Sequence, residues 1–245
     1  MLFLKHCLLH ESFLALLILL SSFSFSFAVD TDGDGVDDIQ DAFPEDASQQ
    51  YLPIDEALSK IEDPNLRSCL EGQTQGFQTA GELTETGCPQ WNNVSSLEGL
   101  QHFTELEVVW GDGPNYSDLT PLQNLIDLRY LRLNHPQGIR ISDAAPLAGL
   151  VNLVELGLSG SNVGSFEFLS QMQQLETLDL NDTRLSSISL LGNLPNLKRL
   201  YIRSTLVREL DGIENLIDLE ALDIQSLQLT SIDQLLGNNQ SLQNL

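Results

Sequence analysis

The sequence predicts an open α/β solenoid, a horseshoe whose stacked units place short parallel strands on the concave face, with a helical cap at the N-terminal end. Leucines recur in register every 22 residues between Leu153 and Ile224. Between these blocks apolar residues continue at a spacing of three, and a segment with helical spacing, 54–70, precedes the first unit. One unit cannot bury its own leucines, so neighbouring units must stack and share a continuous core.

Each repeat is predicted to form a short strand followed by a tight helical or 3₁₀ return. Residues that alternate with the strand leucines face outward. Four blocks of the pattern Leu-x-x-Leu-x-Leu/Ile begin at Leu153, Leu175, Leu197 and Leu219. Two earlier units open at Phe103 and Leu128, and we expect each to carry three extra residues, near 111–115 and 136–138. A degenerate first unit is expected over about 82–102.

A small hydroxyl residue follows the last strand leucine by three positions in three units, at Ser161, Thr183 and Thr205. Such hydroxyls can satisfy backbone groups at a turn. Leu227 takes this position in the next unit, which predicts a weaker ladder toward the C-terminus. The chain ends at Leu245 inside a new Leu-x-x-Leu block, so we expect the array to be incomplete.

The registry over about 82–245 resembles the internalin-type bacterial leucine-rich repeats. The phrase Val-Ser-Ser-Leu-Glu-Gly-Leu at 94–100 is also similar to the opening unit of such arrays. This resemblance implies a leucine-rich-repeat horseshoe that binds a protein ligand on a cell surface or in the surrounding medium. It does not identify the partner.

A helical cap is expected over 49–81, because a solenoid end needs a cover. Asp63-Pro64 is a plausible helix start. Cys69 and Cys88 would pin this cap to the first unit if they form a disulfide, which could contribute about 3 kcal/mol by closing a loop of about 20 residues. The alternative is two buried free thiols. Neither a Cys-x-x-Cys pair nor a Cys/His cluster occurs, which argues against a zinc site.

Residues 1–28 have the layout of a secretory signal peptide. Lys5 and His6 give a weakly positive start, 13–20 is apolar, and Ser26 and Ala28 put small residues before a cleavage site. The alternative is an uncleaved membrane anchor, although the apolar run is short for a span of about 20 residues. No second long apolar run follows, so we expect a secreted or cell-surface protein.

The segment 29–48 has the spacing of a calcium-binding loop. Gly35 falls at loop position 6, where the chain must turn sharply. The oxygen ligands would come from Asp30, Asp32, Asp34, the carbonyl of Val36, Asp38 and Asp41. With its Asp-Ala-Phe-Pro continuation at 41–44, the segment resembles one thrombospondin type 3 repeat, which implies calcium. The alternative is a disordered acidic linker, because charge runs are usually solvated.

The formal net charge of the chain is −24, from 35 acidic and 11 basic residues. A surface this acidic repels nucleic-acid phosphates and anionic lipid headgroups. It suits calcium, cationic partners or a salty medium, and simple solubility explains it equally well.

Exposed Tyr and Arg residues on the predicted concave face are the candidate partner-binding residues. Tyr and Arg are the residue types favoured at interface hot spots. They occupy outward positions of two units, as Tyr130 and Arg132 and as Arg199, Tyr201 and Arg203. The alternative is that these residues occur on this face by chance, without binding a partner, and are stabilised by acidic neighbours such as Asp179. Trp110, expected in the loop after a strand, is a further candidate anchor, unless it packs laterally on the next unit.

No pattern for catalysis is found. The sequence lacks Gly-x-Ser-x-Gly, His-Glu-x-x-His and a phosphate-binding glycine-rich loop. We therefore expect a protein-binding module and not an enzyme. Two other functions stay open, namely a structural spacer of the cell envelope and the N-terminal part of a larger secreted enzyme or adhesin.

Overall fold

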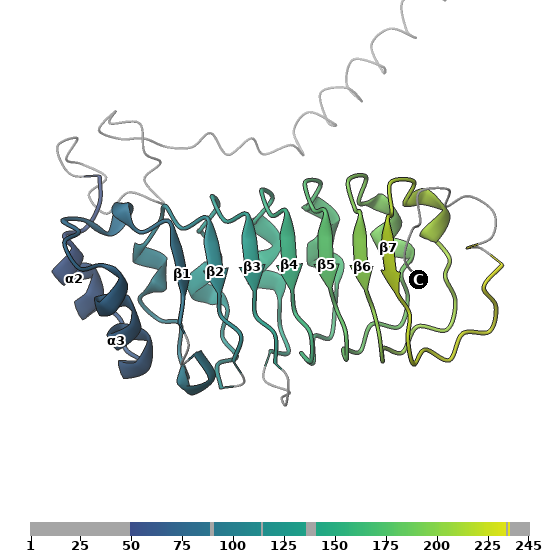
Figure 1. Ribbon diagram of the computed structural model, residues 1–245, viewed down its shortest axis with the longest axis horizontal. Coiled ribbons are helices and arrows are strands. Elements are labelled where there is room, and N and C mark those ends of the chain that lie inside the picture. The colour runs from purple at the N-terminus through teal and green to yellow at the C-terminus, as the bar shows by residue number, and fades with distance from the viewer. Residues whose placement is uncertain (1–49, 89–90, 114, 136–140, 234, 236–245) are drawn as a thin grey trace, which may run out of the picture.

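The computed structural model describes residues 50–88, 91–113, 115–135, 141–233 and 235. Seven parallel strands stand side by side in sequence order in one open sheet, with the helical returns behind them (Figure 1). The predicted solenoid is thereby confirmed. The predicted signal segment 1–28 and calcium-binding segment 29–48 lie outside the described residues. The strands are β1 (Glu85–Gly87), β2 (Val108–Trp110), β3 (Tyr130–Arg132), β4 (Glu155–Gly157), β5 (Thr177–Asp179), β6 (Arg199–Tyr201) and β7 (Ala221–Asp223).

The middle residue of every strand points into the core, and these residues pair in register across the sheet. Each of them is at most 2% exposed. They are Thr86, Val109, Leu131, Leu156, Leu178, Leu200 and Leu222. Burial of one such leucine contributes about 1.5–3 kcal/mol, so the stacked units form one continuous core.

The chain returns behind the sheet through short 3₁₀ helices, which fit the apolar spacing of three because side chains at i and i+3 eclipse in this helix type. In one such return, Ile188, Leu191 and Leu194 are all buried. The helices are η1 (Ala80–Glu82), η2 (Trp91–Asn93), η3 (Leu100–His102), η4 (Thr120–Leu122), η5 (Ala145–Gly149), η6 (Glu167–Gln171), η7 (Ser189–Asn193) and η8 (Ile213–Asn215).

The register of the second unit differs from the prediction by three residues. Val109 is the centre of β2 and pairs with Leu131, 22 residues later, so the three extra residues predicted near 111–115 were wrong. Trp110 consequently lies in strand β2, not in a loop. Leu131 pairs with Leu156, 25 residues later, which places the second predicted insertion between β3 and β4. The predicted insertion near 136–138 falls within residues 136–140, which lie outside the described part of the chain.

The turn after each of the later strands has a left-handed residue at the same position. Gly160, Asp182, Ser204 and Ser226 all have positive φ. In the first three of these turns the next residue is the predicted hydroxyl, whereas Leu227 follows Ser226. Thr183 donates to the carbonyl of Leu180 at 2.7 Å, and Thr205 donates to that of Ile202 at 2.8 Å. The hydroxyl of Ser161 is buried without a hydrogen-bond partner among the described residues.

The N-terminal cap consists of two helices, α2 (Ile54–Ser59) and α3 (Pro64–Gln73). Asp63 is the N-cap of α3 and accepts hydrogen bonds from the N–H groups of Asn65 at 2.8 Å and Leu66 at 3.0 Å. The other carboxylate oxygen accepts from the backbone and hydroxyl of Ser95 in the first unit. One carboxylate therefore starts the helix and also ties it to the array.

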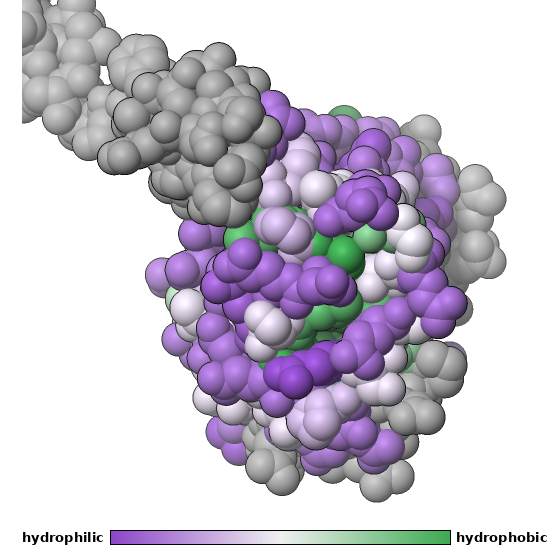
Figure 2. Space-filling view, turned by 90° about the vertical axis from the view of Figure 1, so that its left-hand side faces the viewer, coloured by the Kyte–Doolittle hydropathy of each residue, from purple (hydrophilic) through white to green (hydrophobic). Residues whose placement is uncertain are grey.

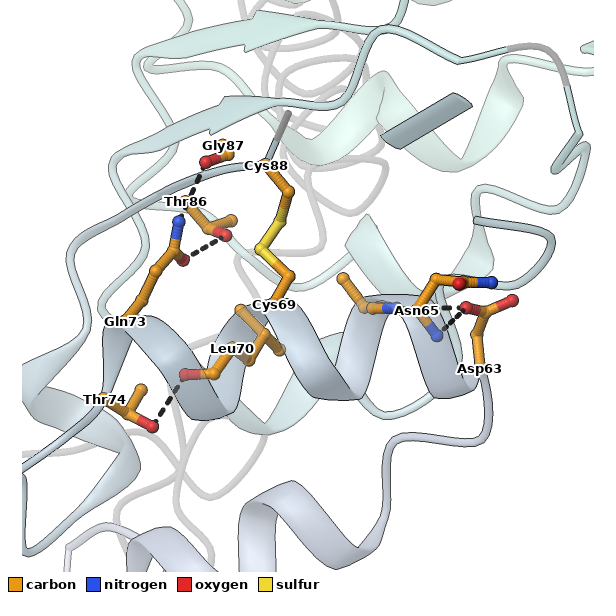
Figure 3. Close-up of a disulfide and its surroundings, with 10 residues drawn as sticks. Asp63, Asn65, Cys69, Leu70, Gln73, Thr74, Thr86, Gly87 and Cys88 are labelled. Atoms are coloured by element: carbon orange, nitrogen blue, oxygen red, sulfur yellow. Dashed lines mark hydrogen bonds between the residues drawn. A yellow bond between two sulfur atoms is a disulfide. The ribbon is translucent and has the colours of Figure 1, made fainter. Parts of the chain in front are cut away.

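A disulfide joins Cys69 of α3 to Cys88, just after β1 (Figure 3). Beside it, Gln73 donates to the carbonyl of Gly87 at 2.8 Å and accepts from the hydroxyl of Thr86 at 2.9 Å. The first of these bonds occupies one backbone carbonyl of β1. The cap thus engages part of the strand backbone that would otherwise be open to pairing with another chain.

The outer end of the cap carries a hollow of about 550 Å³ (Figure 2). Figure 2 shows apolar side chains inside a ring of hydrophilic residues at this end. The apolar lining includes Ile54, Leu58 and Phe77, and Arg67 and Glu71 contribute charged groups. Among the described residues, no helix has the length and apolar character to cross a membrane.

Candidate protein-binding face

The strand geometry presents two rows of side chains on the solvent face of the sheet. Because side chains alternate along a strand, the first and third residues of each strand face away from the buried middle residue. The first row is Glu85, Val108, Tyr130, Glu155, Thr177, Arg199 and Ala221. The second row is Gly87, Trp110, Arg132, Gly157, Asp179, Tyr201 and Asp223.

An aromatic–arginine cluster occupies β2 and β3. The guanidinium carbon of Arg132 lies 5.2 Å from the centroid of the Trp110 ring, a cation–π arrangement. The rings of Trp110 and Tyr130 are 6.4 Å apart, and the Arg132 Nε lies 3.3 Å from a carboxylate oxygen of Glu155. Trp110 remains 37% exposed. The cluster is thus held in place from both sides while its surface stays open to solvent.

Glycine on the neighbouring strand makes room for Trp110. A Cβ on Gly87 would lie 3.1 Å from the Cβ of Trp110 and 3.2 Å from its ring, so a side chain there would press on the indole. The space beside them forms a hollow of about 380 Å³. Its apolar lining includes Phe77, Leu83 and Trp110, and its acidic groups come from Glu82 and Glu85. The indole therefore stands at the rim of a hollow between cap and array.

The end of β2 is held by a hydrogen bond from a buried tyrosine. Tyr116 is buried and its hydroxyl donates to the carbonyl of Gly111, directly after Trp110. Burial, assisted by the negative charge of Asp112, raises the pKa of Tyr116 far above its usual value, so the phenol stays protonated as a donor. The Tyr116 ring also meets His135 edge-on, at 5.3 Å between ring centroids.

A second group of candidates lies on β6. Arg199 donates from Nε to the Thr177 hydroxyl at 3.0 Å. Arg203, just beyond the strand, lies 3.9 Å from a carboxylate oxygen of Asp182, and its backbone N–H donates to the side chain of Asn181 at 2.7 Å. Tyr201 occupies the second row of the face between them.

An acidic stretch separates the two groups. Glu155 and Asp179 face outward on β4 and β5, with Gly157 between Arg132 and Asp179 in the second row. Burial raises the pKa of Asp179. The hydrogen bond from the Asn181 N–H and the positive charges of Arg132 and Arg203 lower it, but burial is the larger effect. Asp179 is therefore a partly desolvated acid whose charged form would gain from a further cation.

The six residues that the sequence singled out all lie on or beside the sheet, but they form two groups. Trp110, Tyr130 and Arg132 come together on adjacent strands, whereas Arg199, Tyr201 and Arg203 lie three strands farther along. Sequence reasoning missed Gly87, and it placed Glu155 on the outward face without foreseeing its ion pair with Arg132. The 22-residue spacing from Trp110 to Arg132, read in the correct register, is the signal that would have joined Trp110 to its cluster.

The described residues do not gather His, Cys, Asp and Glu side chains into a metal-binding group. His135 is 1% exposed, and burial lowers its pKa despite the nearby charge of Asp112, so it behaves as a neutral core residue. No group of three or more His, Cys, Asp or Glu side chains that could hold a metal occurs in the described part of the chain. The six predicted calcium ligands, from Asp30 to Asp41, lie outside it.

Comparisons with known proteins agree with this architecture. A family model described as "Leucine Rich repeats (2 copies)" matches residues 173–215. The fold is that of leucine-rich-repeat proteins. Internalin C2 of Listeria monocytogenes is 21% identical, with a TM-score of 0.59, over 76% of this chain and 93% of that one. An internalin (inlF) of the same species is 22% identical, with a TM-score of 0.54, over 79% and 71%. None of the curated proteins gives a significant match.

Proposed function

We propose that this chain is a secreted or cell-surface recognition module that binds a protein ligand on the solvent face of its sheet, and that it works by binding and not by catalysis. The observation that carries the proposal is the cluster of Trp110, Tyr130 and Arg132. It combines a Trp, a Tyr and an Arg, the three residue types most enriched at interface hot spots, on two adjacent strands of a rigid face.

The cluster is suited to binding because it is already ordered. Arg132 is fixed between the Trp110 ring and Glu155, so little side-chain freedom remains to be lost in a complex, a loss that otherwise costs about 0.5–1.5 kcal/mol for each side chain. The leucine-rich-repeat fold and the resemblance to internalins support a protein ligand and a location at the cell surface or in the medium.

Affinity capture with the mature chain, residues 29–245, tests this function. We expect the wild type to retain a partner that the Trp110→Ala/Tyr130→Ala/Arg132→Ala variant loses. The matched control is Ile126→Ala/Val151→Ala, which removes apolar side chains of similar exposure, 40% and 43%, from outside the strands. Equal retention by all three proteins, each shown to be folded by circular dichroism, would contradict binding on this face.

We also propose that the segment 29–48 binds calcium, as its Asp spacing around Gly35 suggests. Titration calorimetry of the mature chain should show calcium binding of roughly millimolar affinity, as in extracellular modules. The Asp32→Ala/Asp34→Ala variant should lose the heat signal. Identical titrations for the wild type and the variant would refute the assignment without affecting the sheet face.

A further inference from the structure

Basic residues are concentrated in one coil of an otherwise acidic solenoid. Five of the 11 Lys and Arg residues lie between residues 184 and 208, and this stretch contains no Asp or Glu. The coil is positively charged in a chain whose net charge is −24. The five residues are Arg184, Lys198, Arg199, Arg203 and Arg208.

Three of these charges belong to β6 and its two ends. Arg199 begins the strand, Lys198 directly precedes it, and Arg203 follows two residues after Tyr201, the last strand residue. We call Lys198, Arg199 and Arg203 the β6 basic stripe. Tyr201 contributes an aromatic ring to the same line of residues.

The β6 basic stripe is one strand wide. On one side, β5 and its ends carry Glu176, Asp179 and Asp182. On the other side, Glu220 directly precedes β7 and Asp223 ends it. Asp179, Tyr201 and Asp223 are register partners across the three strands. Because neighbouring strands are about 4.8 Å apart, the acidic rows lie within the screening length of about 8 Å at physiological salt.

The neighbouring acids do not neutralise the stripe completely. Lys198 pairs with Glu176 at 3.0 Å, and Arg203 contacts Asp182 at 3.9 Å with both side chains about half exposed. Arg199 bonds to the Thr177 hydroxyl and has no carboxylate oxygen within 4 Å among the described residues. Its guanidinium keeps donors for a planar, bidentate acceptor such as a carboxylate.

We propose that the protein partner presents an Asp or Glu side chain to Arg199 beside Tyr201, and that basic side chains flank this acid and face Asp179 and Asp223. This inference presupposes the proposed protein-binding function and specifies its partner. The flanking acidic rows explain why the ligand is a narrow acidic feature. A broad polyanion such as nucleic acid, heparin or an anionic membrane would place negative charge over β5 and β7, where like charges repel it.

Selection from a displayed library of random short peptides tests the proposal. The library is selected in parallel on the mature wild-type chain, on the Arg199→Glu/Arg203→Glu variant, and on the control Arg184→Glu. Arg184 lies in the same coil, exposed and outside the strands, so this control reverses a charge without changing the stripe.

Peptides enriched on the wild type and on the control, but not on the double variant, should carry an Asp or Glu flanked by Lys or Arg. Synthesised individually, they should bind Arg199→Gln more weakly than wild type, by about tenfold or more, since a close charge pair across an interface can contribute about one decade or more in affinity. The same enriched peptides on all three proteins, differential peptides without acidic residues, or no enrichment at all would each overturn the proposal.

Two further probes separate the sources of negative charge. Heparin and vesicles containing phosphatidylglycerol should bind the wild type no better than the double variant. If they bind the wild type tightly and the variant does not bind them, the stripe is a polyanion site and the proposal is wrong. If peptide selection fails while capture still depends on Trp110, Tyr130 and Arg132, only this inference is wrong. If capture fails as well, the proposed function is wrong.

Discussion

The N-terminal end and the middle of the solenoid are stabilised in different ways. From the middle of the sheet to its last strand, β4 to β7 repeat the same contacts, with a buried leucine at each strand centre and a left-handed residue in each following turn. The N-terminal end depends on contacts that occur there alone among the described residues, namely the disulfide, the Asp63 carboxylate and the Gln73 side chain.

This contrast separates two consequences of substitution. In a repeat array each unit contacts only its neighbours, and stability is approximately a sum over units and interfaces. A change in the middle therefore weakens two interfaces at once and divides the array. A change at the cap should open the first unit and leave the rest folded. Of the four predictions below, two concern the repeats and two concern the cap, and the cap variants test that separation directly.

The largest effect is expected from Leu178→Ala in β5. Leu178 is fully buried between the strand centres of β4 and β6, so truncation should lower the free energy of unfolding by about 2–5 kcal/mol. Leu206→Ala is the matched control because that leucine is 59% exposed, and its effect should stay within about 0.5 kcal/mol. Urea unfolding followed by circular dichroism measures both, and similar losses would contradict the assigned core.

Removal of the disulfide comes next. The Cys69→Ala/Cys88→Ala variant should lose about 3 kcal/mol, because the bond joins residues 19 apart in sequence. Hydrogen exchange should show faster opening of α2 and α3, with protection in β4 to β7 unchanged. Uniformly faster exchange along the whole chain would instead show that cap and array unfold as one unit.

A smaller effect is expected from Gly160→Ala in the turn after β4. Gly160 has φ +73°, and an added Cβ would lie 2.1 Å from the carbonyl oxygen of His135, so the backbone would have to shift at a cost of about 1–3 kcal/mol. Gly164→Ala is the control, since a Cβ there meets nothing within 4 Å. Equal melting temperatures for the two variants would show that this turn adapts without strain.

The sequence predicted the later strands well because their leucines leave one possible register. At the second unit, Leu100, Phe103, Leu106 and Val109 form an unbroken series with a spacing of three. Such a series fits a 3₁₀ return as well as a strand entry, and Gly111 replaces the leucine that marks the strand end elsewhere. The predicted strand therefore started three residues early and left Trp110 in a loop.

The residue types of the candidate binding face were predictable from the sequence, but the contacts between them were not. Alternation along a strand places Tyr130, Arg132, Arg199 and Tyr201 outward without any coordinates. The stacking of Arg132 on Trp110 depends on the corrected register and on the rotamers of both side chains, and the space for the indole depends on Gly87. The alternation of side chains within one strand does not reveal these contacts, because each contact joins residues about one repeat apart.

The smallest predicted effect concerns the pH dependence of the cap. Burial acts to raise the pKa of Asp63, but the hydrogen bonds from Ser95, Leu66 and Asn65 outweigh it and lower the pKa below the ordinary value of 3.8. A carboxyl group with a lowered folded-state pKa stabilises the fold at pH values above about 4, and this contribution declines as the pH falls through the folded-state pKa.

Asp63→Asn isolates this charge, because Asn is also a good N-cap. At pH 6 we expect the variant to be about 1 kcal/mol less stable, since its amide replaces the charged acceptor that faces the N–H and hydroxyl of Ser95. By pH 3 the difference from the wild type should shrink. Urea unfolding at both pH values measures it, with helix exchange rates as the local readout. If the difference in the free energy of unfolding were the same at both pH values, Asp63 would act through its shape alone. If the substitution also changed the hydrogen-exchange rates of β4 to β7, the cap and the array would be coupled after all.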